Sequence, residues 1–116
     1  MAEQHNLIGS DRVEDTRVFD LEGVEIGRIE KLMLEKVSGR VAYAVIKFGD
    51  FFGLGGDSYP LPWDKLEYDE ELDGYHLGAN RDEIEGAPKY PDDGLWGPSY
   101  GRSLYGYYGV APYWGI

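Results

Sequence analysis

The segment RVAYAVIKFG, at residues 40–49, constrains the fold of this chain more than any other stretch. It is rich in β-branched and aromatic residues and lies between Gly39 and Gly49, which is typical of a β-strand. Side chains of a strand alternate between the two faces of a sheet, and here both faces are largely apolar. We therefore expect a central strand that is covered on both sides. One face carries Ala42, Ala44, Ile46 and Phe48, and the other carries Val41, Tyr43, Val45 and Lys47.

Shorter stretches on either side of this segment predict further strands. The 17 glycines and 6 prolines favour many turns and short elements. Two prolines in SYPLPW suit a strand at the edge of a sheet, or the end of a strand, where a missing N–H group is tolerated. Five or six short strands that close on themselves would form a small all-β barrel. The further predicted strands are residues 18–23, 58–63 and 75–77.

Two other segments bear on helix content. The apolar residues of EIGRIEKLMLE, at 25–35, fit a helical spacing, while Gly27 and the short length favour a strand with a local irregularity. Periodicity alone leaves both alternatives open. NRDEIEG, at 80–86, predicts one short helical turn that Asn80 caps and Gly86 ends.

Charge divides the 116 residues into two parts. A chain of this length suits one domain with a single core. The net charge of -11 comes from 22 acidic and 11 basic residues, yet Arg102 is the only charged side chain after Asp93. We therefore expect a barrel domain at residues 1–90 and a Gly/Tyr/Trp-rich C-terminal tail at 91–116. The turn-forming PDDG at 91–94 marks the joint.

The composition argues against several classes of partner and location. An acidic protein repels nucleic acid and anionic lipid on average, so neither is an expected partner. The chain has no cysteine, which fits a reducing compartment and removes disulfides and thiolate chemistry. Its N-terminus, MAEQHNLIGSDR, lacks the basic start and apolar run of a secretory signal, and no apolar stretch is long enough for a membrane helix. We expect a cytoplasmic protein without membrane insertion.

Residues 18–77, continued by RDEIEGAPKY at 81–90, resemble the PRC-barrel domain family. The resemblance rests on EIGRI, SGRVAYAVIKFG, the FFGLGG loop and PLPW in this fixed order. It implies a six-stranded barrel in which residues 25–36 form a long strand instead of a helix.

The resemblance also implies a general role. The closing YYGVAPYW resembles the end of stand-alone bacterial members. The family occurs in the cytosolic domain of the photosynthetic reaction-centre H subunit and in the C-terminal domain of the ribosome-maturation factor, where it binds and assembles proteins without catalysis. Neither specific role is carried over to this chain.

The sequence contains only weak candidates for a metal-binding or catalytic site. Asp69, Glu71 and Asp73 fall at the first, third and fifth positions of a calcium loop, but the twelfth position is Asn80 instead of a bidentate Glu. An acidic β-turn accounts for this segment. His76 alternates with apolar neighbours on a short strand and should face solvent, and His5 lies near the terminus. We predict no catalytic residue, no metal site and no cofactor.

The glycine-rich loop GDFFGLGG, at 49–56, has no basic residue and carries Asp50 and Asp57 at its ends, so a phosphate would be repelled. Its glycines suit a tight connection. We expect Phe51 and Phe52 to cap one end of the barrel, or to form part of a contact surface if a ring stays exposed.

The aromatic tail is the main candidate for partner binding. Ordering it requires apolar surface, which either the barrel of the same chain or another protein can provide. In the first case the tail covers an open edge of its own barrel, and in the second its rings anchor a second copy or a partner. The candidate partner-binding residues are Trp96, Tyr100, Tyr105, Tyr107, Tyr108, Tyr113, Trp114, Phe51 and Phe52.

These observations predict a non-enzymatic protein–protein interaction or assembly module that forms a homodimer and binds an unidentified protein. The alternative is a small-ligand or metal-sensing domain that uses the barrel end or the turn at 69–73.

Overall fold

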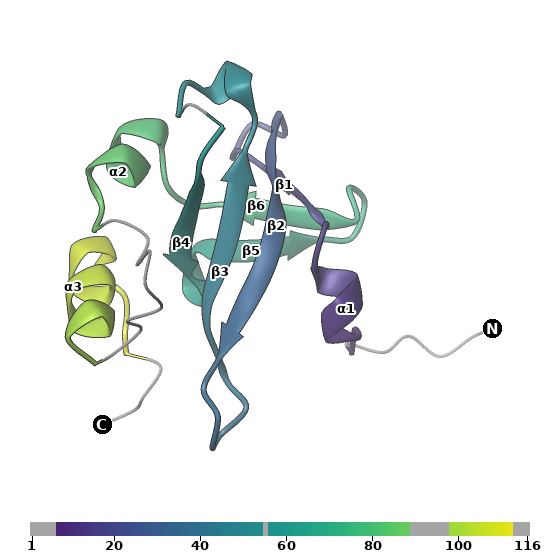
Figure 1. Ribbon diagram of the computed structural model, residues 1–116. Coiled ribbons are helices and arrows are strands. Elements are labelled where there is room, and N and C mark those ends of the chain that lie inside the picture. The colour runs from purple at the N-terminus through teal and green to yellow at the C-terminus, as the bar shows by residue number, and fades with distance from the viewer. Residues whose placement is uncertain (1–6, 55, 89–97, 113–116) are drawn as a thin grey trace.

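The computed structural model describes residues 7–54, 56–88 and 98–112, within which six strands form one sheet (Figure 1). Their order across the sheet is β4-β3-β2-β1-β6-β5. The strands are β1 (Arg17–Phe19), β2 (Glu25–Leu34), β3 (Val41–Phe48), β4 (Ser58–Pro62), β5 (Leu66–Asp69) and β6 (Gly74–Leu77).

The sheet curls because its two ends are close in sequence. Neighbouring strands pair antiparallel except β1 and β6, which pair in parallel. The end strands β4 and β5 are joined by a 3₁₀ turn at Trp63–Lys65. In Figure 1, β5 and β6 run across the direction of β2 and β3, so the six strands enclose a half-barrel. The all-β, six-stranded barrel class predicted from the sequence is confirmed in this form.

Strand β3 lies inside the sheet and is covered on both faces, as its two apolar faces predict. Ala44, Val45 and Ile46 are fully buried, and Tyr43 is 2% exposed, although these residues alternate between the faces. Lys47 is the exposed member of the strand. The strand therefore belongs to two packing layers at once, one inside the curl of the sheet and one outside it.

The ambiguous segment at 25–35 is strand β2, which confirms the reading implied by the family resemblance. Its pairing with β1 shifts register, since Val18 lies opposite Gly27 and Phe19 lies opposite Glu25. A Cβ atom on Gly27 would lie 2.5 Å from the carbonyl oxygen of Lys47 on β3. Only glycine allows this close approach to β3, and it lies at the irregularity in the pairing with β1.

Strand β4 lies at a sheet edge, as the prolines predict, and β1 and β6 correspond to the strands expected at 18–23 and 75–77. Strand β5 was not predicted. Only its first residue, Leu66, is buried, so this short strand carries no alternating apolar pattern.

The helical turn predicted at 80–86 is α2 (Arg81–Gly86). The side chain of Asn80 accepts a hydrogen bond from the N–H of Glu83, whose side chain accepts from the N–H of Asn80, which is a capping box. A further short helix, α1 (Ser10–Val13), buries Val13. Along the described segments, no helix has the length and apolar character to cross a membrane.

The third helix, α3 (Pro98–Tyr108), lies within the expected tail and was not predicted as a helix. Its buried residues are Gly101, Leu104, Tyr105 and Tyr108, a spacing that places them on one helical face. Gly109 ends the helix with a φ of 67°. The N–H groups of Gly109 and Val110 donate to the carbonyls of Gly106 and Tyr105, which is a Schellman motif.

Candidate protein-binding surfaces

Helix α3 packs alongside β4 and against β3 of its own sheet (Figure 1). Leu104 is fully buried, and the Tyr105 hydroxyl donates a hydrogen bond to the backbone carbonyl of Ala42. The ring of Tyr43 on β3 lies 5.8 Å from the ring of Tyr100 and 5.9 Å from that of Tyr105, measured between centroids. These contacts explain how the outer face of β3 is covered.

The candidate aromatic residues therefore divide into three groups. Tyr105 and Tyr108 are buried, and Tyr100 is partly buried with its hydroxyl donating to the Pro88 carbonyl. Tyr107 is 44% exposed and its hydroxyl donates to the Glu83 carbonyl at 2.8 Å, which links α3 to α2. Trp96, Tyr113, Trp114 and the side chain of Phe51 lie outside the described residues.

The predicted loop residue Phe52 lies at one end of the half-barrel. Its ring stacks on that of Phe48 with centroids 5.1 Å apart and stays partly exposed. Beside it is a groove of about 350 Å³, whose lining includes Leu77 and Ala79. The capping role expected for Phe52 thus coexists with an accessible edge of its ring.

Two aliphatic residues of the β1–β2 turn add to this end of the molecule. Leu21, which lines the same groove, is 74% exposed, and Val24 is 52% exposed. The Asp20 carboxylate accepts hydrogen bonds from the N–H groups of Glu22 and Val24, both at 2.9 Å, and so holds the turn. We call Leu21, Val24, Phe52 and Ala79 the barrel-end surface. Sequence analysis missed Leu21 and Val24, whose signal is two aliphatic side chains inside the turn segment DLEGV.

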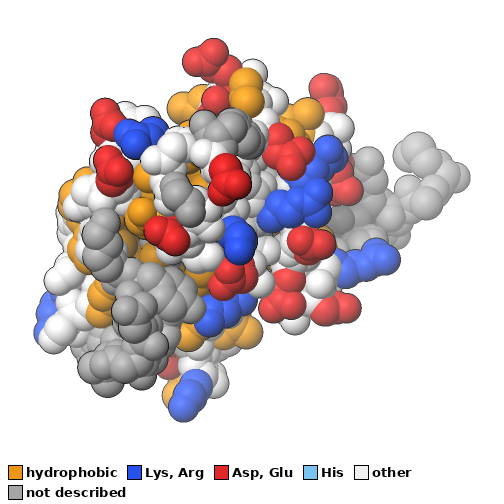
Figure 2. Space-filling view, turned by 45° about the horizontal axis from the view of Figure 1, so that its top comes forward, with side chains coloured by type: hydrophobic (Ala, Val, Ile, Leu, Met, Phe, Trp, Pro, Cys, Tyr) orange, Lys and Arg blue, Asp and Glu red, His pale blue; other side chains and the backbone are white. Residues whose placement is uncertain are grey.

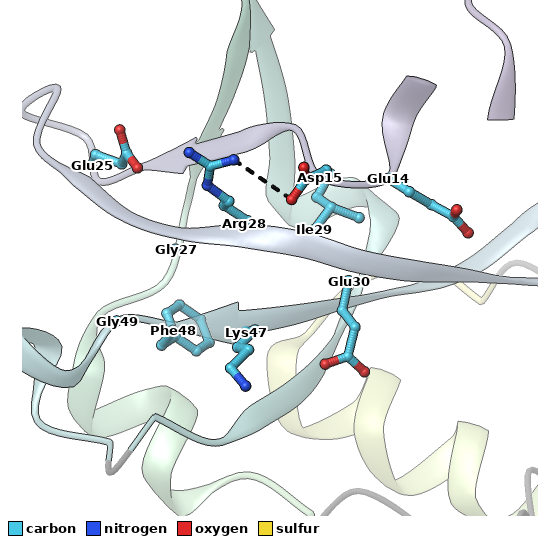
Figure 3. A pocket seen from close by; sticks show the side chains of 10 residues that line it. All are labelled: Glu14, Asp15, Glu25, Gly27, Arg28, Ile29, Glu30, Lys47, Phe48 and Gly49. Atoms are coloured by element: carbon cyan, nitrogen blue, oxygen red, sulfur yellow. Dashed lines mark ion pairs between the residues drawn. The ribbon is translucent and has the colours of Figure 1, made fainter. Parts of the chain in front are cut away.

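A second groove, of about 540 Å³, runs along β2 and β3 (Figure 3). The backbone of Gly27 and Gly49 forms part of its wall, and Ile29 and Phe48 contribute buried apolar side chains. Arg28 and Asp15 form an ion pair at 3.5 Å on one side of β2, and Glu30 and Lys47 point to the other side in Figure 3. This β2 groove carries both signs of charge; its charged residues are Glu14, Asp15, Glu25, Arg28, Glu30 and Lys47.

Charge is mixed over the surface more widely. Figure 2 shows acidic side chains spread over the face that it presents, with Lys and Arg side chains between them and hydrophobic side chains exposed in patches. Within the part of the chain that the structure describes, no charged side chain is buried. The charged chemistry of the described residues is therefore all at the surface.

His76 is held between two acceptors. Its Nδ1 lies 2.9 Å from the Asp20 carbonyl oxygen and its Nε2 lies 2.7 Å from Oδ2 of Asp69. Both contacts are hydrogen bonds only when both ring nitrogens carry a proton. The bond to the Asp20 carbonyl, followed by the bond to Asp69, raises the pKa of His76, and the bond from His76 lowers the pKa of Asp69. In this arrangement His76 ties the β1–β2 turn to β5 and neither nitrogen is available as a base. Its side chain is only 22% exposed, so the expectation that His76 faces solvent is met only in part, because the Asp20 carbonyl and Asp69 cover the ring.

The turn at 69–73 is organised by its own carboxylates. Oδ1 of Asp69 accepts from the N–H groups of Glu71 and Leu72, and Oδ1 of Asp73 accepts from the Tyr68 hydroxyl at 2.8 Å. Asp69 and Asp73 thus bind different partners in the turn instead of converging on one point. Among residues 7–54, 56–88 and 98–112, no group of three or more His, Asp or Glu side chains could hold a metal ion.

Comparison with known proteins agrees with the strand arrangement. A family model described as the PRC-barrel domain matches residues 5–84, which include all six strands and the start of α2. No curated protein matches the chain. Helix α3 lies beyond the matched residues, although its contacts with β3 and β4 make it part of the same packed structure.

Proposed function

Because this chain belongs to the PRC-barrel domain family, we propose that it acts by binding other proteins, that it forms a homodimer, and that the barrel-end surface is the contact. PRC-barrel domains are typically protein-interaction modules and are generally non-catalytic. The proposed location is the cytoplasm.

The exposure of Leu21 and Val24 is the observation that carries this proposal. Both are aliphatic side chains held out in a fixed turn, beside the partly exposed Phe52 and a groove. Burying a fully exposed side chain of this kind contributes about 1.5 to 3 kcal/mol; since Leu21 and Val24 are 74% and 52% exposed, four of them in a symmetric dimer contribute about 4 to 8 kcal/mol. Association costs about 4 to 15 kcal/mol, so this gain reaches the lower part of the range that a dimer must offset. A two-fold axis would bring the same surface of each copy together.

The aromatic tail has a smaller place in this proposal than the sequence suggested. Tyr105 and Tyr108 are used within the chain, which leaves Tyr107 as the exposed ring of α3. Trp96, Tyr113 and Trp114 remain candidate partner contacts in the proposal, and truncation after Asp93 would remove them together with α3.

The test is the double variant Leu21→Asp/Val24→Asp. Light scattering over a range of protein concentrations should show a dimer for the native chain and a monomer for the variant, since two carboxylates per copy cannot be buried unpaired. Val37→Asp is the matched control, because Val37 is 93% exposed in the β2–β3 turn at the opposite end of β2 and should leave the mass unchanged.

Three outcomes have distinct meanings. A native chain that stays monomeric at all concentrations contradicts the homodimer. A dimer that survives the double variant removes the barrel-end surface as its contact. A dimer lost equally in Val37→Asp shows a general effect of added charge. For the metal-sensing form of the alternative role, no group of three or more His, Asp or Glu side chains among the described residues could hold an ion.

A further inference from the structure

Three of the six arginines in this acidic chain line a single groove. The groove measures about 510 Å³ and lies among α1, β1, β2 and the β5–β6 turn. Arg12, Arg17 and Arg28 face it together with Asp15 and Asp73, so it carries one more positive than negative side chain. We call it the arginine groove. It shares no residue with the barrel-end groove and meets the β2 groove at the Arg28–Asp15 pair (Figure 3).

The three guanidinium groups are only partly used inside the chain. Arg17 donates to the Leu72 carbonyl at 2.9 Å and lies over the Phe19 ring, 5.4 Å from its centroid. Arg28 contacts Asp15 at 3.5 Å, with 53% and 83% of the two side chains exposed. Arg12 is exposed, and its side chain has no hydrogen bond or ion pair with any residue that the structure describes.

This arrangement leaves donors for an outside acceptor. Each guanidinium offers five N–H groups in a fork that fits the two oxygens of a carboxylate. Fixing Arg17 by its backbone contact also prepares it for binding, because less side-chain freedom is lost. The groove has a local excess of positive charge, whereas the chain as a whole has a net charge of -11. A local charge of this sign complements an anionic partner.

Apolar side chains stand beside the arginines. Ile8 is 50% exposed and Tyr68 is 49% exposed, and both line the groove. The Tyr68 ring is held edge-on against Tyr75 with centroids 5.3 Å apart, and its hydroxyl is bonded to Asp73. A side chain between two carboxylates of a bound peptide could pack on this fixed ring.

We propose that the arginine groove binds an acidic segment of a partner protein, in which carboxylates flank an apolar or aromatic side chain. The carboxylates pair with Arg12 and Arg28, and the apolar side chain packs against Tyr68 and Ile8. The charge of the whole chain opposes a nucleic acid at this site, because a long polyanion extends beyond the groove over acidic surface, whereas a short peptide does not. The site is separate from the proposed dimer contact and does not depend on it.

Fluorescence anisotropy with a short labelled peptide of glutamates around one phenylalanine tests the proposal. The native chain should bind it, and binding should weaken as salt is raised from about 0.05 to about 0.5 M, because the Debye length shortens. Arg12→Gln and Arg28→Gln should each weaken binding about two- to fivefold, as expected for exposed ion pairs. The same peptide with glutamine in place of glutamate should not bind.

Arg102→Gln is the matched control, since Arg102 is an exposed arginine on α3 and the substitution changes the net charge by the same amount. Equal weakening by Arg102→Gln, or equal binding of the glutamine peptide, would overturn the proposal. Tighter binding of a labelled single-stranded oligonucleotide would overturn the choice of a protein segment. Melting temperatures check that the variants are folded. Light scattering of Arg12→Gln tests whether peptide binding is independent of dimer formation. The variant should have the same mass as the native chain, whether the native chain is a monomer or a dimer.

Discussion

Helix α3 and the β1–β2 turn both carry apolar side chains, and these side chains differ in whether they are buried or exposed. The helix is rich in aromatic residues, and its Leu104 and Tyr105 are 0% and 4% exposed. The turn is short and acidic, and its Leu21 and Val24 are 74% and 52% exposed. Aromatic residues of α3 thus belong to the chain's own core, while two aliphatic residues of the turn stay exposed to solvent.

The difference follows from position on the sheet. The buried residues of α3 repeat at a spacing that forms one helical face, and that face lies on β3 and β4. The β1–β2 turn lies beyond the strand ends, where the side chains have no second layer to meet, and Asp20 holds its backbone. Exposure is therefore decided by the availability of a facing layer, not by hydrophobicity.

The largest expected loss of stability follows substitution of Leu104. Leu104→Ala should lower the free energy of unfolding by about 2 to 5 kcal/mol, because it removes a fully buried side chain and leaves a cavity. Leu21→Ala, the same substitution at an exposed site, should change it by less than about 0.5 kcal/mol. Urea unfolding of both variants measures the difference. Similar values for the two would mean that α3 is not docked on the sheet in solution.

A smaller effect is expected from the tyrosine hydroxyls of α3. Tyr105→Phe should cost about 1 to 2 kcal/mol, because the buried Ala42 carbonyl loses its donor. Tyr107→Phe removes a hydrogen bond that is open to water and should cost less than about 0.5 kcal/mol. Urea unfolding again provides the measurement. A larger loss of unfolding free energy for Tyr107→Phe than for Tyr105→Phe would contradict the buried role of Tyr105.

The smallest expected effect is a pH dependence of stability that arises from His76 and Asp69, which hold the β1–β2 turn against β5. The folded pKa of His76 is raised, so its contribution to stability is fully present below the unfolded pKa of about 6.5 and is lost as pH rises through the folded pKa. The folded pKa of Asp69 is lowered, so its contribution is present above the unfolded pKa and is lost as pH falls through the folded pKa. The pair therefore stabilises the fold most between the unfolded pKa of Asp69 and the unfolded pKa of His76.

His76→Gln tests this pair. The loss of stability caused by the substitution should be greatest in mildly acidic solution and should shrink as pH rises past neutrality. Melting temperatures of the native chain and the variant across this range measure it. A loss that is constant from mildly acidic to alkaline pH would show that His76 is not held as an imidazolium between Asp20 and Asp69.

Predictability from sequence varied from strand to strand. The two apolar faces of β3 were sufficient to predict a covered strand, and the prolines of β4 limited it to an edge strand or a strand end. The periodicity of β2 fits both a helix and a strand, and the family resemblance decided it. Strand β5 has a single buried residue, Leu66, and exists because β6 offers it a hydrogen-bonding edge. No pattern in residues 66–69 themselves indicates that β6 will lie beside them.

The candidate binding residues show the same limit. The resemblance predicted a six-stranded barrel, and the position of Phe52 at the end of the observed half-barrel follows from the loop between β3 and β4. The sequence did not predict the helix at 98–108, because Gly101 and Gly106 lower its helix propensity and its stability comes from packing on the sheet. The exposure of Leu21 and Val24 and the grouping of Arg12, Arg17 and Arg28 depend on which strands become neighbours.

The amino-acid sequence by itself determined that this chain builds a small β-structure around a strand at residues 40–49, because a strand with two apolar faces is stable only when both are covered. The tertiary structure alone decided which apolar residues cover it and which remain outside. The physical reason is that burial depends on a facing layer, and the layers here join residues far apart in sequence, such as Tyr105 with Ala42 and Arg17 with Leu72.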